Sequence, residues 1–390
     1  MPKPWCVMPF NQMSLKESGK YAVCCEAKES DIAINDMTPL EFFQSDYMND
    51  IRDSFVFGKP DNDICKKCIA LEKSGATSKR IRENEVADRQ TILNNYMNDE
   101  YKLDFIKFSA VGNKCNLKCV MCGPRSSSLI QKEINEHELT GYGFAKADPH
   151  VAFKDVNNKE VWLSDFKKIL LNTKELQFSG GEPTIIPEVY NICNWIIDDP
   201  DLQHIKIHMN TNGMTAHYKI KPLIEKGQKV ELSISVDALG DWDEYIRFNT
   251  KWKMIERNFD EYLKLRDQYP NFRFMVQPTI QLLNVGYIHH LVDYCVDRDI
   301  PIYVVNTVTN PSHFNPVILP NKLKQFYLKK VFTESKNPDI IDNVIKILNS
   351  SSEDLNMFRI TFAVLSLFDH TRNVNWRKLW PELVEYENSI

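Results

Sequence analysis

Three cysteines lie within eight residues in the segment NKCNLKCVMCGP, which spans residues 113–124. Cys115, Cys119 and Cys122 are separated by three positions and then by two. A structural zinc site needs four tetrahedral ligands, whereas this segment offers three thiols and no histidine. A four-iron cluster held by three thiolates leaves one iron open to another ligand. The pattern favours such a cluster, and a zinc site or an unreactive group of cysteines are the alternatives.

The cysteine segment follows a short apolar run, and similar runs recur along the chain. Strand-like runs occupy six ranges, which are 104–110, 175–180, 205–213, 230–238, 272–280 and 301–308. Helix-like apolar spacing is found at 125–138, 161–172, 187–198, 215–227, 242–268 and 286–299. This alternation predicts a parallel sheet covered by helices, because parallel strands need long crossover connections. The trio then lies at the C-terminal end of the first strand, where such folds place their chemistry.

The number of strand and helix units limits the fold. Six units are too few for a closed eight-stranded barrel, so the predicted fold class is α/β with a six-stranded partial (β/α)6 barrel. Residues 140–160 show no clear period and are interpreted as an insertion. The expected domains are a cysteine-rich module at 1–69, a helical linker at 70–103, the barrel at 104–310 and a helical extension at 311–390.

A second motif, FSGGEPT, closes the second predicted strand and contains Gly180, Gly181, Glu182 and Pro183. Glycine allows close approach of the backbone to a ligand, although the motif alone also suits an ordinary strand-ending turn. Together, CNLKCVMC and GGEP resemble the radical S-adenosylmethionine (SAM) enzymes. The signature of that family is C-x3-C-x2-C after the first strand of a six-stranded partial barrel.

The resemblance implies a 4Fe-4S cluster on Cys115, Cys119 and Cys122, with SAM chelating the open iron. In the family, reduction of the cluster cleaves SAM to a 5'-deoxyadenosyl radical, which abstracts a hydrogen atom from the substrate. The resemblance further implies a flavodoxin- or ferredoxin-type reductant. It also implies SAM contacts from the GGEP motif, with Glu182 helping to receive the ammonium group of the methionine moiety. No catalytic side chain beyond the ligands is assigned.

Weaker matches to the same family follow in chain order. The candidate SAM-binding residues are Asn212 in NTNG, Ser233, Ser235 and Asp237 in SISVDA, Arg247 in YIR, and Gln277 in VQPTI. Arg247 resembles an arginine that reaches the cofactor carboxylate. The alternative for each residue is a strand-end side chain that satisfies the local backbone.

The N-terminal cysteines form a second group. Cys6, Cys24, Cys65 and Cys68, in the context of GKYAVCC and FGKPDNDICKKC, resemble the SPASM or shortened twitch module, which binds an auxiliary four-iron cluster. The module usually follows the barrel, whereas here it precedes it. Cys25 can replace Cys24 as the ligand, and structural zinc is the alternative to a cluster. The two later cysteines, Cys193 and Cys295, are expected to be buried apolar residues.

The composition of the chain argues against some classes of function and favours others. A net charge of -5 and a pI near 6.0 argue against a general nucleic-acid surface. No apolar stretch is long enough for a membrane span, and ten cysteines without an export signal favour the cytoplasm. The expected substrate is a peptide or protein side chain. The alternatives are a small metabolite, sugar or nucleoside and, outside enzymes, an iron-sulfur electron-transfer or scaffold protein.

Overall fold

The computed structural model describes residues 5–58, 63–73, 77–98, 100, 102–139, 152–215 and 217–389. The chain divides into two compact units. Unit 1 draws on the ranges 1–113, 148–209 and 223–231, and unit 2 draws on 114–147, 210–222 and 232–390. Three elements contribute residues to both units, namely β6 (Lys206–Thr211), α10 (Lys221–Glu225) and β7 (Val230–Ile234).

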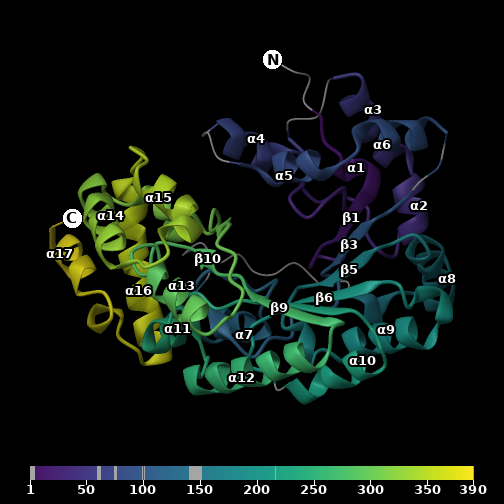
Figure 1. Ribbon diagram of the computed structural model, residues 1–390. Helices are drawn as coiled ribbons and strands as arrows, with labels where there is room; N and C mark the ends of the chain where they lie inside the picture. The colour runs from purple at the N-terminus through teal and green to yellow at the C-terminus, as the bar shows by residue number, and fades with distance from the viewer. Residues whose placement is uncertain are drawn as a thin grey trace. The chain divides into compact units, whose positions relative to one another are not determined.

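Unit 1 is built on a mostly parallel sheet (Figure 1). Its strands run in the order β2 (Tyr21–Ala22), β1 (Gln12–Leu15), β3 (Phe105–Phe108), β5 (Glu175–Phe178) and β6. Strands β3, β5 and β6 pair in parallel, β1 joins β3 in parallel, and β2 joins β1 antiparallel. The N-terminal segment thus extends the sheet that carries the first predicted strand, which the sequence pattern did not predict.

Aromatic packing covers one face of this sheet. Alternate residues of a strand point to the same face, and the alternate residues Phe108 and Ile106 of β3 are fully buried. The Phe108 ring lies 6.0 Å from Trp162 and 5.9 Å from Phe166, both in α8 (Lys159–Leu170). Figure 1 shows α9 (Pro187–Asp198) beside α8.

The other helices of unit 1 are α1 (Met8–Asn11), α2 (Pro39–Gln44), α3 (Asp46–Val56), α4 (Lys66–Lys73), α5 (Lys79–Val86), α6 (Arg89–Met97) and the short 3-10 helices η1 (Phe153–Asp155), η2 (Pro183–Ile185) and η3 (Pro200–Leu202).

Unit 2 holds short strand pairs and a helical region. Strand β4 (Lys118–Cys119) pairs antiparallel with β8 (Arg247–Phe248), and β10 (Thr279–Ile280) pairs in parallel with β11 (Asn306–Thr307). Strand β9 (Phe272–Val276) also lies in this unit. The helices are α7 (Ser128–His137), α11 (Gly240–Ile246), α12 (Trp252–Gln268), α13 (Ile288–Asp297), α14 (Asn321–Glu334), α15 (Asp342–Leu348), α16 (Leu355–Arg372), α17 (Pro381–Ser389) and the 3-10 helices η4 (His217–Lys219), η5 (Ser312–Phe314), η6 (Pro316–Ile318), η7 (Pro338–Ile341) and η8 (Trp376–Lys378).

The structure confirms an α/β fold with a parallel central sheet, and it confirms helices after residue 318. The six-stranded barrel and the domain boundaries stay predictions. Of the expected insertion at 140–160, residues 140–151 lie outside the described residues. Among the described residues, no helix has the length and apolar character needed to span a membrane.

Four element predictions were wrong in their extent. The single helix expected at 242–268 is interrupted, because Arg247 and Phe248 pair with β4 and Asn249 has a positive φ of 80°. The strand expected at 272–280 ends at Val276 and resumes as β10, since Pro278 has no N–H for the ladder. The strand expected at 301–308 is reduced to β11 and one bridge, and 215–227 contains η4 and α10 in place of one helix.

Candidate functional site

The cysteine trio lies in unit 2, in a loop fixed at both ends. Cys119 belongs to β4 and is paired with Arg247 of β8. The loop then leads into α7, whose N-cap residue Ser127 accepts a hydrogen bond from the backbone N–H of Ile130. The Ser127 hydroxyl also donates to the Leu117 carbonyl oxygen at 2.7 Å. The residues between the strand and the helix are therefore held in place before any ligand binds.

The three thiols differ in environment. Cys119 is buried, whereas Cys115 and Cys122 are partly exposed, and the N–H of Leu117 donates to Cys115 Sγ at 3.5 Å. A hydrogen bond from Cys122 lowers the pKa of Cys119 to about 7, and the charge of Arg247 acts in the same direction against the effect of burial. Thiolates are the form that binds iron. Three thiols in one ordered loop, one of them readily ionised, suit a cluster with three protein ligands.

A buried ion pair lies next to this loop. Arg247 Nη1 donates to Asp237 Oδ2 at 3.0 Å, and the other oxygen of Asp237 accepts the N–H of Thr279 at 2.7 Å. Among the described residues, Arg247 Nε has no hydrogen-bond partner. Burial raises the pKa of the neighbouring Asp243 to about 7, although the charge of Arg247 opposes this rise. The structure thus brings the predicted residues Arg247 and Asp237 together.

Asn212 connects the third predicted strand end to the cysteine loop. Its Nδ2 donates to Asn116 Oδ1 at 2.8 Å, and Asn116 is the residue after Cys115. The next residue, Gly213, has a φ of 74°, and an added Cβ would lie 2.7 Å from the side chain of Ile234. The side chain of the predicted residue Asn212 therefore contacts the cysteine loop.

The remaining predicted residues of unit 2 lie at neighbouring strand ends. The N–H of Ser235 donates to the Thr211 carbonyl oxygen at 2.7 Å, and the N–H of Gln277 donates to the Ile234 carbonyl oxygen at 2.8 Å. Ser233 is buried, and Ser235 and Gln277 are partly exposed. These contacts place the ends of β6, β7 and β9 next to one another, and the assignment of the side chains to SAM stays a prediction.

The GGEP motif lies in unit 1, at the end of β5. Gly180 has a φ of 119°, and a Cβ there would lie 3.0 Å from the Ser109 carbonyl oxygen. The N–H of Gly181 donates to the Gly112 carbonyl oxygen at 3.2 Å. Both glycines thus contact the backbone that follows β3, and a side chain at position 180 would collide with it. The requirement for glycine at 180 is steric and conformational.

Glu182 and Pro183 start the short helix η2. Glu182 is buried, and its Oε1 accepts hydrogen bonds from the N–H and the hydroxyl of Thr184. This carboxylate is therefore positioned as the N-cap of η2, with Pro183 at the first helical position. Its expected contact with the SAM ammonium stays a prediction.

Four N-terminal cysteines line one cavity in unit 1. Cys6, Cys24, Cys65 and Cys68 form its wall together with other residues that include Arg80. Burial raises the pKa of the Cys6 thiol, and the neighbouring Cys24, Cys65 and Cys68 add to this rise. The four cysteines grouped by the sequence pattern are thus neighbours in space, and their shared cavity does not include Cys25.

Cationic side chains lie next to Cys25 and in the wall of this cavity. Lys79 Nζ lies 3.1 Å from Cys25 Sγ, and Lys16 Nζ donates to the Cys25 carbonyl oxygen at 2.6 Å. Arg80 donates through Nε to Glu72 at 3.0 Å and through Nη1 to the Trp5 carbonyl oxygen at 3.0 Å. Fixed positive charges near several thiolates reduce the electrostatic cost of ionising them together.

The two later cysteines are buried, as expected. Cys193 lies in α9 and Cys295 in α13, and neither side chain reaches solvent. Burial raises the pKa of both thiols. They behave as small apolar residues of the core and serve as controls for the other cysteines.

A polar cavity of about 710 Å³ in unit 1 was not predicted from the sequence. Glu175, Gln177 and His208 form part of its wall from the sheet, and Lys79 and Glu83 contribute from α5. His208 Nδ1 lies 2.7 Å from Glu175 Oε1 and 3.3 Å from Gln177 Nε2. Burial acts to raise the pKa of Glu175, but His208 and Lys206 produce a net lowering. The wall residues Glu175, Gln177 and His208 belong to ordinary strand sequences, so the sequence pattern did not indicate a cavity here.

The chain has similarity to known proteins over part of its length. Residues 109–276 match the model of the Radical SAM superfamily, and this range contains the cysteine trio and the GGEP motif. Two curated proteins named GTP 3',8-cyclase are similar over shorter stretches. The protein from Clostridium acetobutylicum is 26% identical over 42% of this chain and 44% of its own length. The protein from Pseudomonas fluorescens is 23% identical over 35% of this chain and 34% of its own. The chain thus matches less than half of the length of these relatives.

Two solved structures that match parts of the chain have low sequence identity and TM-scores below 0.5. One is described as native anSMEcpe with bound AdoMet, with 16% identity, a TM-score of 0.41, and coverage of 59% of this chain and 60% of that one. Another is Streptococcus suis SuiB bound to the precursor peptide SuiA, with 14% identity, a TM-score of 0.37, and coverage of 95% of this chain and 73% of that one.

Proposed function

Because residues 109–276 form a radical SAM domain, we propose that the chain is a radical SAM enzyme that acts on a peptide or protein side chain. The observation that carries this proposal is the ordered loop with Cys115, Cys119 and Cys122 inside the matched range. When a four-iron cluster and SAM are bound, they supply a 5'-deoxyadenosyl radical that abstracts a hydrogen atom from the substrate.

The chain's own residues hold and shield this site. Cys115, Cys119 and Cys122 are the proposed ligands, and the pairing of β4 with β8 fixes the middle one. Arg247 places a positive charge near the thiolates, and its ion pair with Asp237 holds the guanidinium in position. The burial of Cys119 keeps water away from that ligand. The protein thus contributes position, charge and exclusion of solvent.

We assign Cys6, Cys24, Cys65 and Cys68 to a second four-iron cluster. Four thiolates complete the ligand set of such a cluster, and these four line one cavity. Arg80 in the cavity wall and Lys79 beside Cys25 offset the charge of the thiolates. Zinc is the alternative occupant, because four cysteines also suit its tetrahedral geometry.

The substrate proposal rests on the resemblance of this cysteine-rich module to modules of peptide-modifying enzymes. We further assign the polar cavity of unit 1 to substrate binding. Its volume of about 710 Å³ lies within the range of about 300–1,000 Å³ common for ligand pockets. Its wall carries both signs of charge, which suits a polar backbone or side chain. A flavodoxin- or ferredoxin-type reductant and a cytoplasmic location complete the proposal, since ten cysteines favour a reducing compartment.

A nucleotide substrate is the second candidate. The observation that favours it is the naming of the similar curated proteins as GTP 3',8-cyclases. A triphosphate needs several cationic contacts, and Lys79, Lys102 and Lys174 line the same cavity. This candidate uses the same cysteine loop and differs only in what donates the hydrogen atom.

The test of the proposed activity is anoxic reconstitution followed by addition of dithionite and SAM. We expect 5'-deoxyadenosine from the wild type and from Cys193→Ala, which alters a buried cysteine outside both groups. Cys119→Ala is expected to form at least about 100-fold less, because the cluster loses one of three ligands. No product from the wild type, or equal product from Cys119→Ala, would reject the activity.

A second measurement separates the substrates. The wild type is incubated with deuterated GTP or with deuterated peptides encoded by short reading frames beside its gene. Deuterium in 5'-deoxyadenosine identifies the molecule that donates the hydrogen atom. Transfer from a peptide supports the first proposal, and transfer from GTP alone replaces it with the second.

A further inference from the structure

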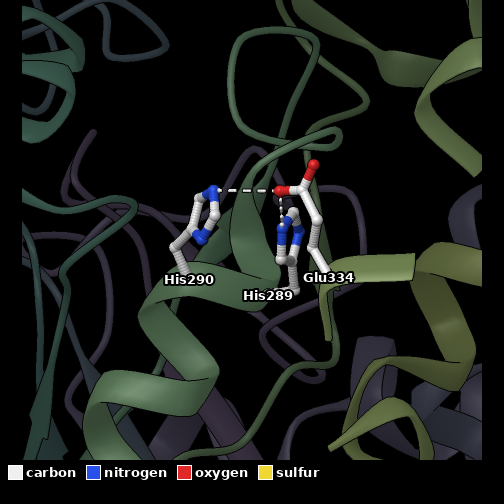
Figure 2. Close-up of side chains that lie close together, drawn as sticks. All are labelled: His289, His290 and Glu334. Atoms are coloured by element: carbon white, nitrogen blue, oxygen red, sulfur yellow. Dashed lines mark hydrogen bonds and ion pairs between the residues drawn. The ribbon is translucent and has the colours of Figure 1, made fainter. Parts of the chain in front are cut away.

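Two histidines and a glutamate meet at the ends of two helices in unit 2. His289 and His290 lie in the first turn of α13, and Glu334 is the last residue of α14. Figure 2 shows one carboxylate oxygen of Glu334 directed toward both imidazole rings. His289 Nε2 lies 3.2 Å and His290 Nε2 lies 3.6 Å from this oxygen, Oε2. One ligand atom from each residue lies within 4.8 Å of the others.

These separations correspond to those in a metal site. A zinc ion binds imidazole nitrogen and carboxylate oxygen at about 2.0–2.2 Å, so two ligand atoms at a tetrahedral angle are about 3.4 Å apart. The two distances to Glu334 Oε2, 3.2 and 3.6 Å, lie on either side of this value, and a nitrogen of each histidine lies within 4.8 Å of the other. An ion can therefore be placed among the three groups without a large movement of helix ends.

The trio is held by its surroundings. Asp293, one turn after His289 in α13, accepts a hydrogen bond from the backbone N–H of Lys336 at 3.2 Å and from Asn337 Nδ2 at 2.7 Å. These contacts fix the chain just after Glu334 against α13. Lys336 Nζ also pairs with Asp297 at 2.8 Å. The carboxylate and the imidazoles are therefore brought together by contacts that do not involve the trio.

Access and charge also suit an ion. The His289 side chain is fully buried, whereas those of His290 and Glu334 are 36% and 42% exposed, so the site opens to solvent on one side. Burial lowers the pKa of both histidines, and the charge of Glu334 acts in the opposite direction. Lys330 is a cation near both histidines, and its ammonium is held over the Tyr287 ring at 3.8 Å.

We propose that His289, His290 and Glu334 bind one divalent transition-metal ion, for which Zn²⁺ is the best match. Two imidazoles and one carboxylate are ligands that zinc accepts, and three protein ligands leave a fourth position for water. The ion would join the start of α13 to the end of α14. This site is separate from both cysteine groups and does not depend on the proposed reaction.

The test must prevent zinc from occupying the cysteines. Protein is therefore reconstituted anoxically with iron and sulfide, incubated with Zn²⁺ and desalted, and its metals are measured by mass spectrometry. The variants are His290→Ala and Glu334→Gln, both at partly exposed positions. The matched control is His204→Ala, which removes an exposed histidine outside the trio. Melting curves without zinc confirm that each variant folds.

The wild type and His204→Ala are expected to retain about one zinc per chain, and the two trio variants to bind at least about tenfold more weakly. X-ray absorption at the zinc edge should show nitrogen and oxygen neighbours at about 2.0–2.2 Å without sulfur. Equal zinc in the wild type and both trio variants, or a zinc environment dominated by sulfur at about 2.3 Å, overturns the proposal.

Discussion

Arg372 and Glu133 form a buried, bidentate ion pair in unit 2. Arg372 Nε and Nη2 donate to the two oxygens of Glu133 at 3.0 and 2.9 Å, and the side chains are 1% and 3% exposed. Arg372 Nη1 also donates to the carbonyl oxygen of Lys118, the residue before Cys119, at 2.9 Å. The last turn of α16 is therefore coupled to the loop that carries the cysteine trio.

Removing one partner of this pair should strongly destabilise the protein. Glu133→Gln leaves the Arg372 charge without its carboxylate, and breaking a buried pair costs about 3–5 kcal/mol. The control Glu136→Gln breaks the exposed contact of Glu136 with Lys132 and should cost less than about 1 kcal/mol. Urea denaturation of anoxically reconstituted protein measures both changes. An equal decrease in the free energy of unfolding for the two variants would contradict the assigned role of the pair.

Alanine at Gly180 should be more harmful than alanine at Gly112. Both glycines have positive φ, 119° and 104°, so each substitution carries backbone strain of about 1–3 kcal/mol. A Cβ at position 180 would also lie 3.0 Å from the Ser109 carbonyl oxygen, whereas position 112 has no atom within 4 Å. Thermal unfolding should show the larger decrease in melting temperature for Gly180→Ala. An equal decrease would show that the collision adds nothing to the strain.

Asp243 should make stability fall as the pH rises toward 8. Burial raises its pKa from 3.8 to about 7, so the folded state binds the proton more tightly than the unfolded state. The resulting stability is present at low pH and is lost as the pH rises through about 7. Asp243→Asn cannot titrate, so relative to the wild type it should gain about 1–4 kcal/mol between pH 5 and pH 8. A constant difference between the two proteins would contradict this assignment.

Iron content should identify the ligands of the proposed second cluster. The wild type should bind about eight irons per chain and Cys65→Ala about four, because the N-terminal cluster loses a ligand. Cys24→Ala should behave like Cys65→Ala, since Cys24 lines the shared cavity. Cys25→Ala should retain the iron. About four irons together with a zinc ion whose neighbours are sulfur atoms at about 2.3 Å would instead support the zinc alternative.

His208→Gln should weaken substrate binding without affecting the cysteine loop. His208 forms part of the cavity wall with Glu175 and Gln177, and the exchange removes an imidazole that contacts both side chains. With the substrate found by deuterium transfer, KM should rise by about tenfold, which corresponds to about 1.4 kcal/mol. Formation of 5'-deoxyadenosine without substrate should stay unchanged. An unchanged KM would remove the cavity from the substrate site.

Local sequence patterns were sufficient to predict the reaction class and part of the fold. The spacing of Cys115, Cys119 and Cys122 and the GGEP motif lie in short segments, so they are recognisable without knowledge of distant contacts. The alternation of apolar runs also predicted the parallel sheet, because side-chain periodicity reflects the nearest layer of packing. The sequence context grouped the four N-terminal cysteines, and the structure places them around one cavity, whereas their role as cluster ligands stays a prediction.

The tertiary structure decided the features that depend on distant partners. Arg372 and Glu133 are 239 residues apart, and His289 and Glu334 are 45 residues apart. Strand β1 joins β3 although the two are separated by most of the N-terminal segment, and β4 interrupts the helix expected at 242–268 by pairing with Arg247 and Phe248. Periodicity within a window describes which face of an element is buried, but it contains no information about which element covers it. The ion pair, the polar cavity and the histidine-glutamate trio therefore arise only when the chain is folded.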